Sequence, residues 1–249
     1  MSANGTGGTP PEFQSPSSAD LESARRRFLL RVPKGGRILD VNSGCGHDTL
    51  EFLRLGYQVD AFDASPELCE CSTAATGVPA RCIALHELPA GLRPVYHGVW
   101  ASAALLRVNG SQTSEVLRRL GDLLVPGGML YLSALHGGGA CQRQSRQQSC
   151  GARFTPEGRY FHTTDRDSLV RAFHAVPALR IVDTWFSSGH RLSVVFLFRR
   201  RNRWIHALAV KSQPRAPVLR FRPLPAARCP SGLAAAAALN AMQDLSNPD

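Results

Sequence analysis

The chain has 249 residues, of which 43% are hydrophobic and 19% charged. That length accommodates one α/β domain with a buried core but not two comfortable domains, and the composition is ordinary for a soluble globular protein. No apolar run reaches the roughly 18 residues that span a bilayer, so we expect no membrane segment.

The formal net charge of +10 is unevenly distributed along the chain. Residues 1–179 carry 18 basic and 16 acidic side chains, whereas residues 180–249 carry 11 and 3. The excess therefore belongs to the C-terminal third, where we interpret it as a solvated basic tail in preference to a nucleic-acid surface.

The first 18 residues do not indicate a targeting signal, and the cysteines do not indicate a metal site. The first 18 residues lack the basic start and apolar stretch of a signal peptide, so a cytoplasmic location is expected. Seven cysteines in a reducing compartment are more often free thiols than disulfides. Neither Cys69 with Cys71 nor Cys141 with Cys150 has a zinc spacing with a second pair, so no metal is expected.

The first half of the domain reads as strands alternating with helices. A helix capped by Asp20 ends before Pro33, and the apolar run 37–41 is the first strand. A glycine-containing turn opens the next helix. Residues 57–63 form a second strand, and Ser65 caps a helix that runs to about residue 75.

Further strands are predicted at residues 80–85, 97–105 and 129–135. The helix between the last two covers residues 111–124 and is stopped by the Pro-Gly-Gly of residues 126–128. This alternation predicts an α/β, Rossmann-like, doubly wound and mostly parallel seven-stranded sheet.

Residues 136–156 lack a periodic apolar pattern and are expected to form a loop. A helix capped by Thr164 or Asp165 continues through Phe173. Apolar segments at 178–186, 192–198 and 204–210 are expected to pair antiparallel at one sheet edge. The predicted organisation is a disordered N-terminus (1–19), one domain (20–211) and a basic Pro/Ala-rich tail (212–249).

The turn after the first strand carries Gly44 and Gly46, and glycines there let backbone amides approach a polar ligand. Such pairs also occur in purely structural turns. The third glycine of a dinucleotide-binding loop is missing, which argues against NAD. Asp63, at the end of the second strand, would accept the hydroxyls of a ribose or, alternatively, cap Ser65 and the next helix.

The segment ILDVNSGCGHDTLEFLRLGYQVDAFDAS (residues 38–65) resembles the first two motifs of class I S-adenosylmethionine-dependent methyltransferases. It resembles in particular the small bacterial ones of the tellurite-resistance type, which usually read ILDxGCGxGRDTxxFxxxGYxVxAxD. The resemblance continues more loosely through HELP (86–89), YHGVWASAALLRV (96–108), LLVPGGMLYLS (123–133) and GRYFHTTDRDSLVRAF (158–173).

The resemblance implies that S-adenosylmethionine is the cofactor, and it implies a site for each part of that molecule. The amino acid portion would be held by Asp40, Asn42, Ser43, Gly44 and Gly46. Asp63 would bind the ribose, Ala64 would flank the adenine, and Leu85 and His86 would pack against and hydrogen-bond it. Ala101 and Leu106 would form the wall below the methionine part.

Four positions depart from the family pattern. Asn42 replaces the first glycine, although Asn tolerates left-handed backbone angles better than other residues do. His97 replaces an acid and His47 an arginine. Arg107 replaces a substrate-facing histidine, which suggests either an altered substrate, such as an anionic one, or a lost substrate.

No catalytic residue can be assigned, because methyl transfer from a sulfonium needs alignment, and needs a base only when the acceptor must lose a proton. Arg107 and His136 are weak substrate candidates; Tyr160 and His162 are possible groups at the rim of the site. The prediction is a methyltransferase acting on a small molecule. The alternatives are a degenerate domain with a binding role and a nucleic-acid methyltransferase.

Overall fold

The structure is a computed structural model that describes residues 16, 18–88, 93–137, 152–154, 160–188 and 203–213. The described residues up to Gln213 belong to one compact unit. Among the described helices, none is long and apolar enough to cross a membrane.

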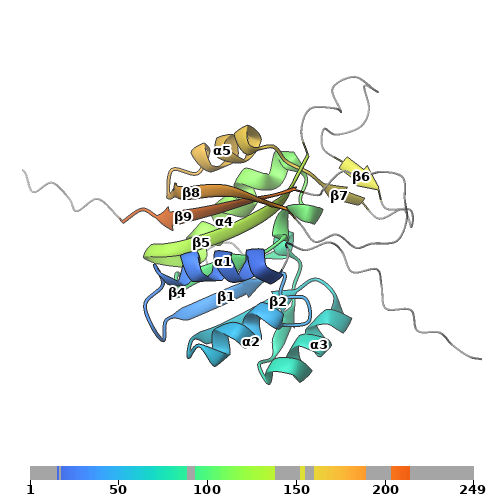
Figure 1. Cartoon of the computed structure of the whole chain (residues 1–249), viewed down its shortest axis with the longest axis vertical. Helices are drawn as coiled ribbons and strands as arrows, with labels where there is room; N and C mark the ends of the chain where they lie inside the picture. Colours follow the sequence, from blue (N-terminus) through green and yellow to red (C-terminus); the bar gives the residue numbers. More distant parts are fainter. Residues whose placement is uncertain are drawn as a thin grey trace, which may run out of the picture. The chain divides into compact units, whose positions relative to one another are not determined.

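Seven strands form one sheet in the order β3-β2-β1-β4-β5-β9-β8 (Figure 1). They are β1 (Arg37–Val41), β2 (Gln58–Asp63), β3 (Ala80–Cys82), β4 (Tyr96–Ala101), β5 (Leu124–His136), β8 (Leu179–Ser188) and β9 (Arg203–Lys211). The first five run parallel, and β9 is antiparallel to both β5 and β8. The predicted fold class is confirmed; the antiparallel strand lies one position inside the edge.

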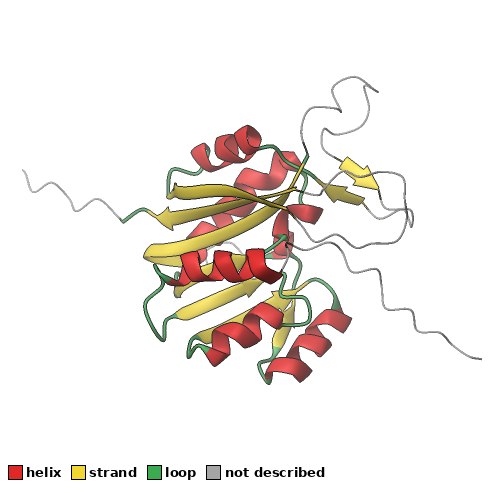
Figure 2. Ribbon diagram, viewed as in Figure 1, coloured by secondary structure: helices red, strands yellow, loops and turns green. Residues whose placement is uncertain are grey.

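Helices cover both faces of this sheet, as the layers in Figure 2 show. They are α1 (Ser18–Leu29), α2 (His47–Arg54), α3 (Pro66–Thr76), α4 (Thr113–Leu123) and α5 (Arg166–His174), with 3-10 turns η1 (Leu85–Glu87), η2 (Ala104–Arg107) and η3 (Gly110–Gln112). Phe28 of α1 and Phe52 of α2 bury one face, and Leu117 of α4 with Phe173 of α5 bury the other. The site must therefore lie at an end of the strands, since both faces are filled.

An aromatic stack runs across the α1 face of the sheet. Trp100 of β4 stacks on Tyr131 of β5 with ring centroids 3.7 Å apart, and Trp185 of β8 stacks on His206 of β9 at 5.0 Å. His206 is fully buried and shares hydrogen bonds with the Tyr131 hydroxyl (2.9 Å) and the Ser187 hydroxyl (2.8 Å). Burial lowers the pKa of His206 to about 4. The imidazole is therefore neutral at physiological pH.

Several predicted boundaries are wrong in instructive ways. β3 ends at Cys82 and β4 at Ala101, because the chain turns there into η1 and η2 at the carboxyl ends of the strands. The Pro-Gly-Gly of residues 126–128 lies within β5, after α4 has ended. Part of the expected loop is strand: β6 (Ala152–Phe154) pairs with β7 (Tyr160–His162) in a separate small sheet. The predicted segment 192–198 lies outside the described residues.

Candidate cofactor site

The glycine turn, residues 42–46, lies at the carboxyl end of β1 and has three residues in the left-handed backbone region. Asn42 has φ 62°, Gly44 φ 55° and Gly46 φ 81°. Asn is the residue other than Gly that adopts this conformation at least cost, so the expectation that the turn survives the substitution at position 42 is confirmed. The backbone N–H of Ser43 donates to the carbonyl of Phe62 at 3.1 Å, which ties the turn to β2.

The two glycines of the turn serve different purposes. A Cβ placed on Gly46 would lie 2.6 Å from Ser72 Oγ, 2.8 Å from Thr76 Cγ2 and 3.2 Å from Ser72 Cα. A Cβ on Gly44 would meet no heavy atom of the described residues within 4 Å. Gly46 thus permits the close packing of the turn on α3, whereas Gly44 faces open space in which a ligand can approach the backbone.

Asp63, at the end of β2, is buried and joins two loops. One carboxylate oxygen accepts the backbone N–H of Gly44 at 3.0 Å, and the other accepts the backbone N–H of Ser65 at 3.0 Å. The contact with Ser65 is the structural alternative that the sequence left open. A carboxylate offers about four acceptor positions, so its remaining lone pairs are still available to ribose hydroxyls.

Asp40 lies on β1, two residues before the glycine turn. Its side chain is buried and accepts a hydrogen bond from the Thr49 hydroxyl at 2.6 Å. Burial, together with the nearby Asp48 carboxylate, raises the pKa of Asp40 well above its usual value. The hydrogen bond ties β1 to α2, and direct contact of Asp40 with an amino acid group stays a prediction.

Ser43 has a buried hydroxyl oxygen with no hydrogen-bond partner among the described residues. An unsatisfied buried hydroxyl is costly and calls for an explanation such as a ligand or an ordered water. Ser43 immediately precedes Gly44, whose N–H is held by the Asp63 carboxylate, so the orphaned Oγ belongs to the same turn as the open space at Gly44. Together these groups fit a polar, hydroxyl-bearing ligand.

The residues predicted to border the adenine lie at the same edge of the sheet, since β3 pairs with β2. Ala64 is exposed, Leu85 is half-buried in η1 and His86 is exposed. The carbonyl of His86 accepts a hydrogen bond from Arg119 of α4 at 2.7 Å, which anchors η1. Their contacts with adenine stay predictions.

The loop after β4 completes the edge. Ala101 is buried at the end of the strand, and Leu106 is half-buried in η2. Between them Ala103 has φ 54°, a strained conformation for a residue with a Cβ, and its N–H donates to Ser133 Oγ at 2.8 Å. Sequence reasoning missed this anchored turn, because neither Ala nor Ser signals a left-handed conformation at that position.

A second feature that the sequence did not reveal links α1 to the start of α2. Asp48, in the first turn of α2, pairs with Arg25 of α1 and accepts the indole N–H of Trp100 at 2.9 Å. Arg25 and Asp48 have side-chain exposures of 18% and 14%, so water screens this pair little. The contact fixes the helix that follows the glycine turn.

The four departures from the family pattern lie in different places. His97 lies at the amino end of β4, where its Nδ1 accepts the N–H of Arg37 at 3.1 Å, so it is remote from the glycine turn. His47 is exposed at the start of α2, and Arg107 is exposed at the end of η2. Only Asn42 belongs to the turn itself.

His136 lies at the carboxyl end of β5. Because Leu132 pairs with Ala101 at the end of β4, His136 extends about 13 Å further along its strand. Its Nδ1 is buried without a hydrogen-bond partner among the described residues, and its ring packs edge-on against Phe186 at 5.3 Å. His162 of β7 is buried, and burial lowers its pKa. β5 and β7 both contact η2, so the roles of His136 and His162 at the rim of the site stay predictions, and of the side chain of Tyr160 nothing is described.

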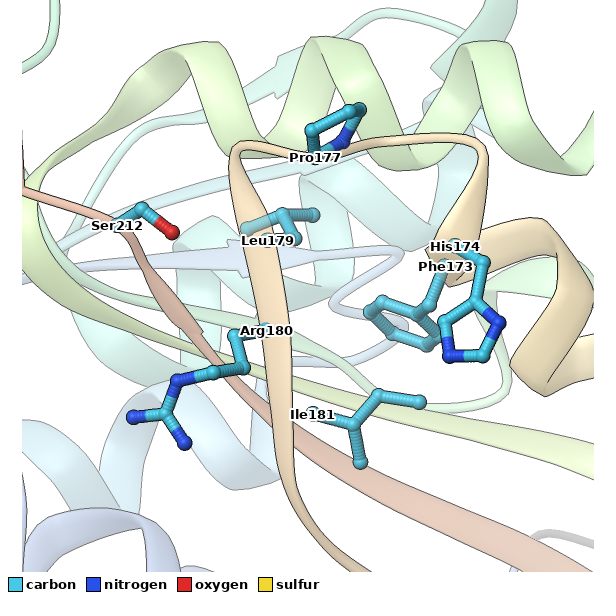
Figure 3. A pocket seen from close by; sticks show the side chains of 7 residues that line it. All are labelled: Phe173, His174, Pro177, Leu179, Arg180, Ile181 and Ser212. Carbon is cyan, nitrogen blue, oxygen red and sulfur yellow. The ribbon is translucent and has the colours of Figure 1, made fainter.

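A pocket elsewhere in the chain is not part of this arrangement. It lies at the amino end of β8, opposite the glycine turn, because Leu179 pairs with Lys211 near the start of β5. Figure 3 shows its lining residues, Phe173, His174, Pro177, Leu179, Arg180, Ile181 and Ser212. Over the described ranges, no group of three or more His, Cys, Asp or Glu side chains is arranged to hold a metal.

The strand order, the glycine turn and the acid at the end of β2 define the class I methyltransferase fold. No protein-family model matches the sequence. The chain is 32% identical over 109 residues to a ubiquinone biosynthesis O-methyltransferase of Xanthomonas axonopodis pv. citri, covering 42% of this chain and 45% of that protein. It is 32% identical over 132 residues to the protein of that name from Xanthomonas oryzae pv. oryzae, covering 51% and 52%.

Solved structures share the fold at low sequence identity. A 1,6-didemethyltoxoflavin-N1-methyltransferase of Burkholderia thailandensis, with bound S-adenosylhomocysteine, matches with a TM-score of 0.60 at 19% identity over 79% of this chain and 80% of that one. A methyltransferase of Methanosarcina mazei matches with a TM-score of 0.59 at 16% identity over 75% and 97%. A [4+2]-cyclase matches with a TM-score of 0.59 at 17% identity over 79% and 82%, so the fold alone does not fix the reaction.

The chain therefore has the class I methyltransferase fold, and over about half its length it is similar in sequence to curated O-methyltransferases. The chain spans about half the length of the curated relatives it matches. The likeness to tellurite-resistance-type enzymes stays a prediction.

Proposed function

We propose that the chain binds S-adenosylmethionine at the carboxyl ends of β1, β2 and β4 and transfers its methyl group to a small-molecule acceptor. One observation carries the proposal: the left-handed glycine turn leaves open space at Gly44 directly beside the Asp63 carboxylate. That arrangement places a charged acceptor for ribose hydroxyls beside a stretch of backbone that a ligand can approach closely.

Each part of the site has a definite task in this proposal. Asp63 binds the ribose and holds Gly44 through its N–H. The glycine turn and the Ser43 hydroxyl hold the amino acid portion, while Ala64, Leu85 and His86 border the adenine. The cofactor supplies a methyl group activated by its sulfonium. Ala101 and the strained turn at Ala103 fix the wall against which that end of the cofactor lies.

The acceptor is proposed to lie beyond this wall, near η2. Arg107 is exposed there and gives the entrance a positive charge, which favours an acceptor that carries an acidic group. Alignment of acceptor and methyl group in a water-excluding site supplies most of the rate enhancement for such a transfer. The relatives' name suggests an oxygen acceptor, which is part of the proposal and requires the acceptor's proton to be removed.

A domain that has kept the fold without transferring methyl groups is the second candidate. The observation that favours it is that both oxygens of Asp63 already accept backbone N–H groups. The nucleic-acid alternative draws on basic residues that fall largely outside the described ranges. The cytoplasmic location expected from the sequence stays a prediction.

Calorimetric titration of the purified chain with S-adenosylmethionine, S-adenosylhomocysteine and NAD tests the cofactor proposal. We expect binding of the first two in the micromolar range and none of NAD. Gly44→Ala should weaken binding at least about tenfold because its Cβ would enter the cofactor's space, a change of about 1.4 kcal/mol. His97→Gln, at the opposite end of β4, is the matched control and should bind normally.

Methyl transfer is tested separately with S-adenosylmethionine labelled in the methyl group and a panel of small hydroxylated aromatic acids. Transfer to one of them supports the enzyme. Cofactor binding without transfer to any acceptor in a broad panel supports the degenerate domain, and absence of cofactor binding refutes both the proposed cofactor and the proposed site.

A further inference from the structure

All four cysteines in the described part of the chain are free thiols close to the proposed cofactor site. Cys45 is the residue between the two glycines of the glycine turn, and Cys71 lies on α3. Cys69 also lies on α3, and Cys82 is the last residue of β3. This concentration of thiols has no part in methyl transfer as proposed above.

Cys45 and Cys71 flank the closest approach between the glycine turn and α3. A Cβ on Gly46 would lie only 3.2 Å from the Cα of Ser72, so the two backbones are in direct contact. Cys45 and Cys71 immediately precede these two residues. This packing brings the two thiols to neighbouring positions, and the hydrogen bond with Cys71, ahead of burial, raises the pKa of the Cys45 thiol to about 11.

The two thiols differ in exposure. Cys71 is exposed and Cys45 is half-buried, so an oxidant in solution reaches Cys71 first. Cys69 is buried, and its thiol points to the carbonyl oxygens of Asp63 and Arg81 at 3.5 Å each. A thiol held in this way is shielded from solvent oxidants.

We propose that Cys45 and Cys71 form a redox-sensitive pair that hydrogen peroxide converts to a disulfide, and that this cross-link closes the cofactor site. The regulatory part rests on the proposed function. In the first step peroxide oxidises the Cys71 thiol to a sulfenic acid and leaves as water. The Cys45 sulfur then attacks the Cys71 sulfur, and the hydroxyl departs as a second water with the Cys45 proton. Two thiols are oxidised and one peroxide is reduced to two waters.

The disulfide distorts the glycine turn because a sulfur–sulfur bond is about 2.05 Å long, far shorter than a contact between unbonded sulfurs. Cys45 must move toward α3 and take its neighbour Gly44 with it. The N–H of Gly44 is held by Asp63 at 3.0 Å, so the shift disturbs the groups proposed to hold the cofactor. We expect the oxidised protein to bind S-adenosylmethionine at least about tenfold more weakly.

The disulfide is tested first, without reference to the cofactor. The full chain is treated with hydrogen peroxide for several hours, since a protonated thiol reacts slowly, and its peptides are mapped by mass spectrometry before and after reduction. A linked pair containing Cys45 and Cys71 is expected in the unaltered protein and in Cys82→Ser, the matched exposed control. It should be absent in Cys71→Ser. Absence of the pair from the unaltered protein, or its replacement by a link to Cys69 or Cys82, overturns the proposal.

The consequence for the site is tested by calorimetry on reduced, oxidised and re-reduced protein. Oxidation should weaken S-adenosylmethionine binding in the unaltered chain, reduction by a dithiol should restore it, and Cys71→Ser should respond to neither treatment. A mapped disulfide with unchanged affinity overturns the regulatory part. Failure of the reduced protein to bind refutes the proposed function instead, and leaves the mapped disulfide as evidence for the thiol pair alone.

Discussion

Substituting Gly46 by Ala tests how tightly the glycine turn packs on α3. The added Cβ would meet Ser72 Oγ at 2.6 Å and Thr76 Cγ2 at 2.8 Å, which can shift, but also Ser72 Cα at 3.2 Å, which cannot shift without moving α3. Overpacking of this kind costs about 1–3 kcal/mol. The left-handed φ of 81° adds about 1 kcal/mol for a residue with a Cβ.

Gly46→Ala should therefore lower the free energy of unfolding by about 3 kcal/mol, or Tm by about 10 °C for a chain of this size. Gly56→Ala is the matched control, because its φ of 83° carries the same backbone cost and its Cβ would meet no described heavy atom within 4 Å. It should lower the free energy of unfolding by about 1 kcal/mol. Both are measured by urea unfolding monitored by circular dichroism. Equal destabilisation of the two variants would refute the close packing of the turn on α3.

Three further predictions concern buried polar groups. Asp63→Ala leaves the N–H groups of Gly44 and Ser65 without their acceptor, so it should lower the free energy of unfolding by about 2 kcal/mol. It should also weaken cofactor binding by a few kcal/mol at most. Unchanged affinity in calorimetry would mean that the site is misplaced. Asp48→Asn breaks the shielded pair with Arg25 and should lower the free energy of unfolding, measured in urea, by about 2 kcal/mol. Glu22→Gln, whose pair with Arg26 is exposed, is the control and should lower it by less than about 0.5 kcal/mol. Similar values for the two variants would contradict the importance of burial. His206 has a folded pKa of about 4, below the unfolded value near 6.5, so the unfolded state takes up the proton first and stability falls as the pH drops from 6.5 toward 4. Between pH 7.5 and 5 the unaltered protein should lose about 2 kcal/mol more than His206→Gln does, and parallel pH profiles of the two would refute a neutral buried imidazole.

The sheet could be predicted from the sequence because its signals are local. Residues 37–41 and 57–63 are short apolar runs bounded by glycine or capping residues, and β1 and β2 are found there within one residue. The errors arose where strands end. The apolar run 97–105 continues past Ala101, and only tertiary contact, the N–H of Ala103 reaching Ser133 on β5, turns the chain at that point.

The glycine turn could be predicted because it needs backbone conformations that Gly and Asn supply, and Asn42 does adopt the left-handed region. The different tasks of Gly44 and Gly46 could not be predicted from the sequence, because they depend on α3, which lies 20 or more residues further along the chain. His97 was noted as a departure from the family pattern, yet it caps the amino end of β1. The motif that contains His97 did not indicate that this residue lies at the amino ends of the strands, away from the glycine turn.

The place of β9 has a consequence for how the chain is made. This strand pairs with β5 on one side and β8 on the other, and most of its residues are fully buried. On the ribosome, β1 to β5 are complete some 70 residues before β9 is synthesised, so β5 would present an unpaired apolar edge throughout that interval. The nascent chain is then exposed to pairing with its neighbours, and a chaperone that shields strand edges would raise its yield more than one that accelerates helix formation.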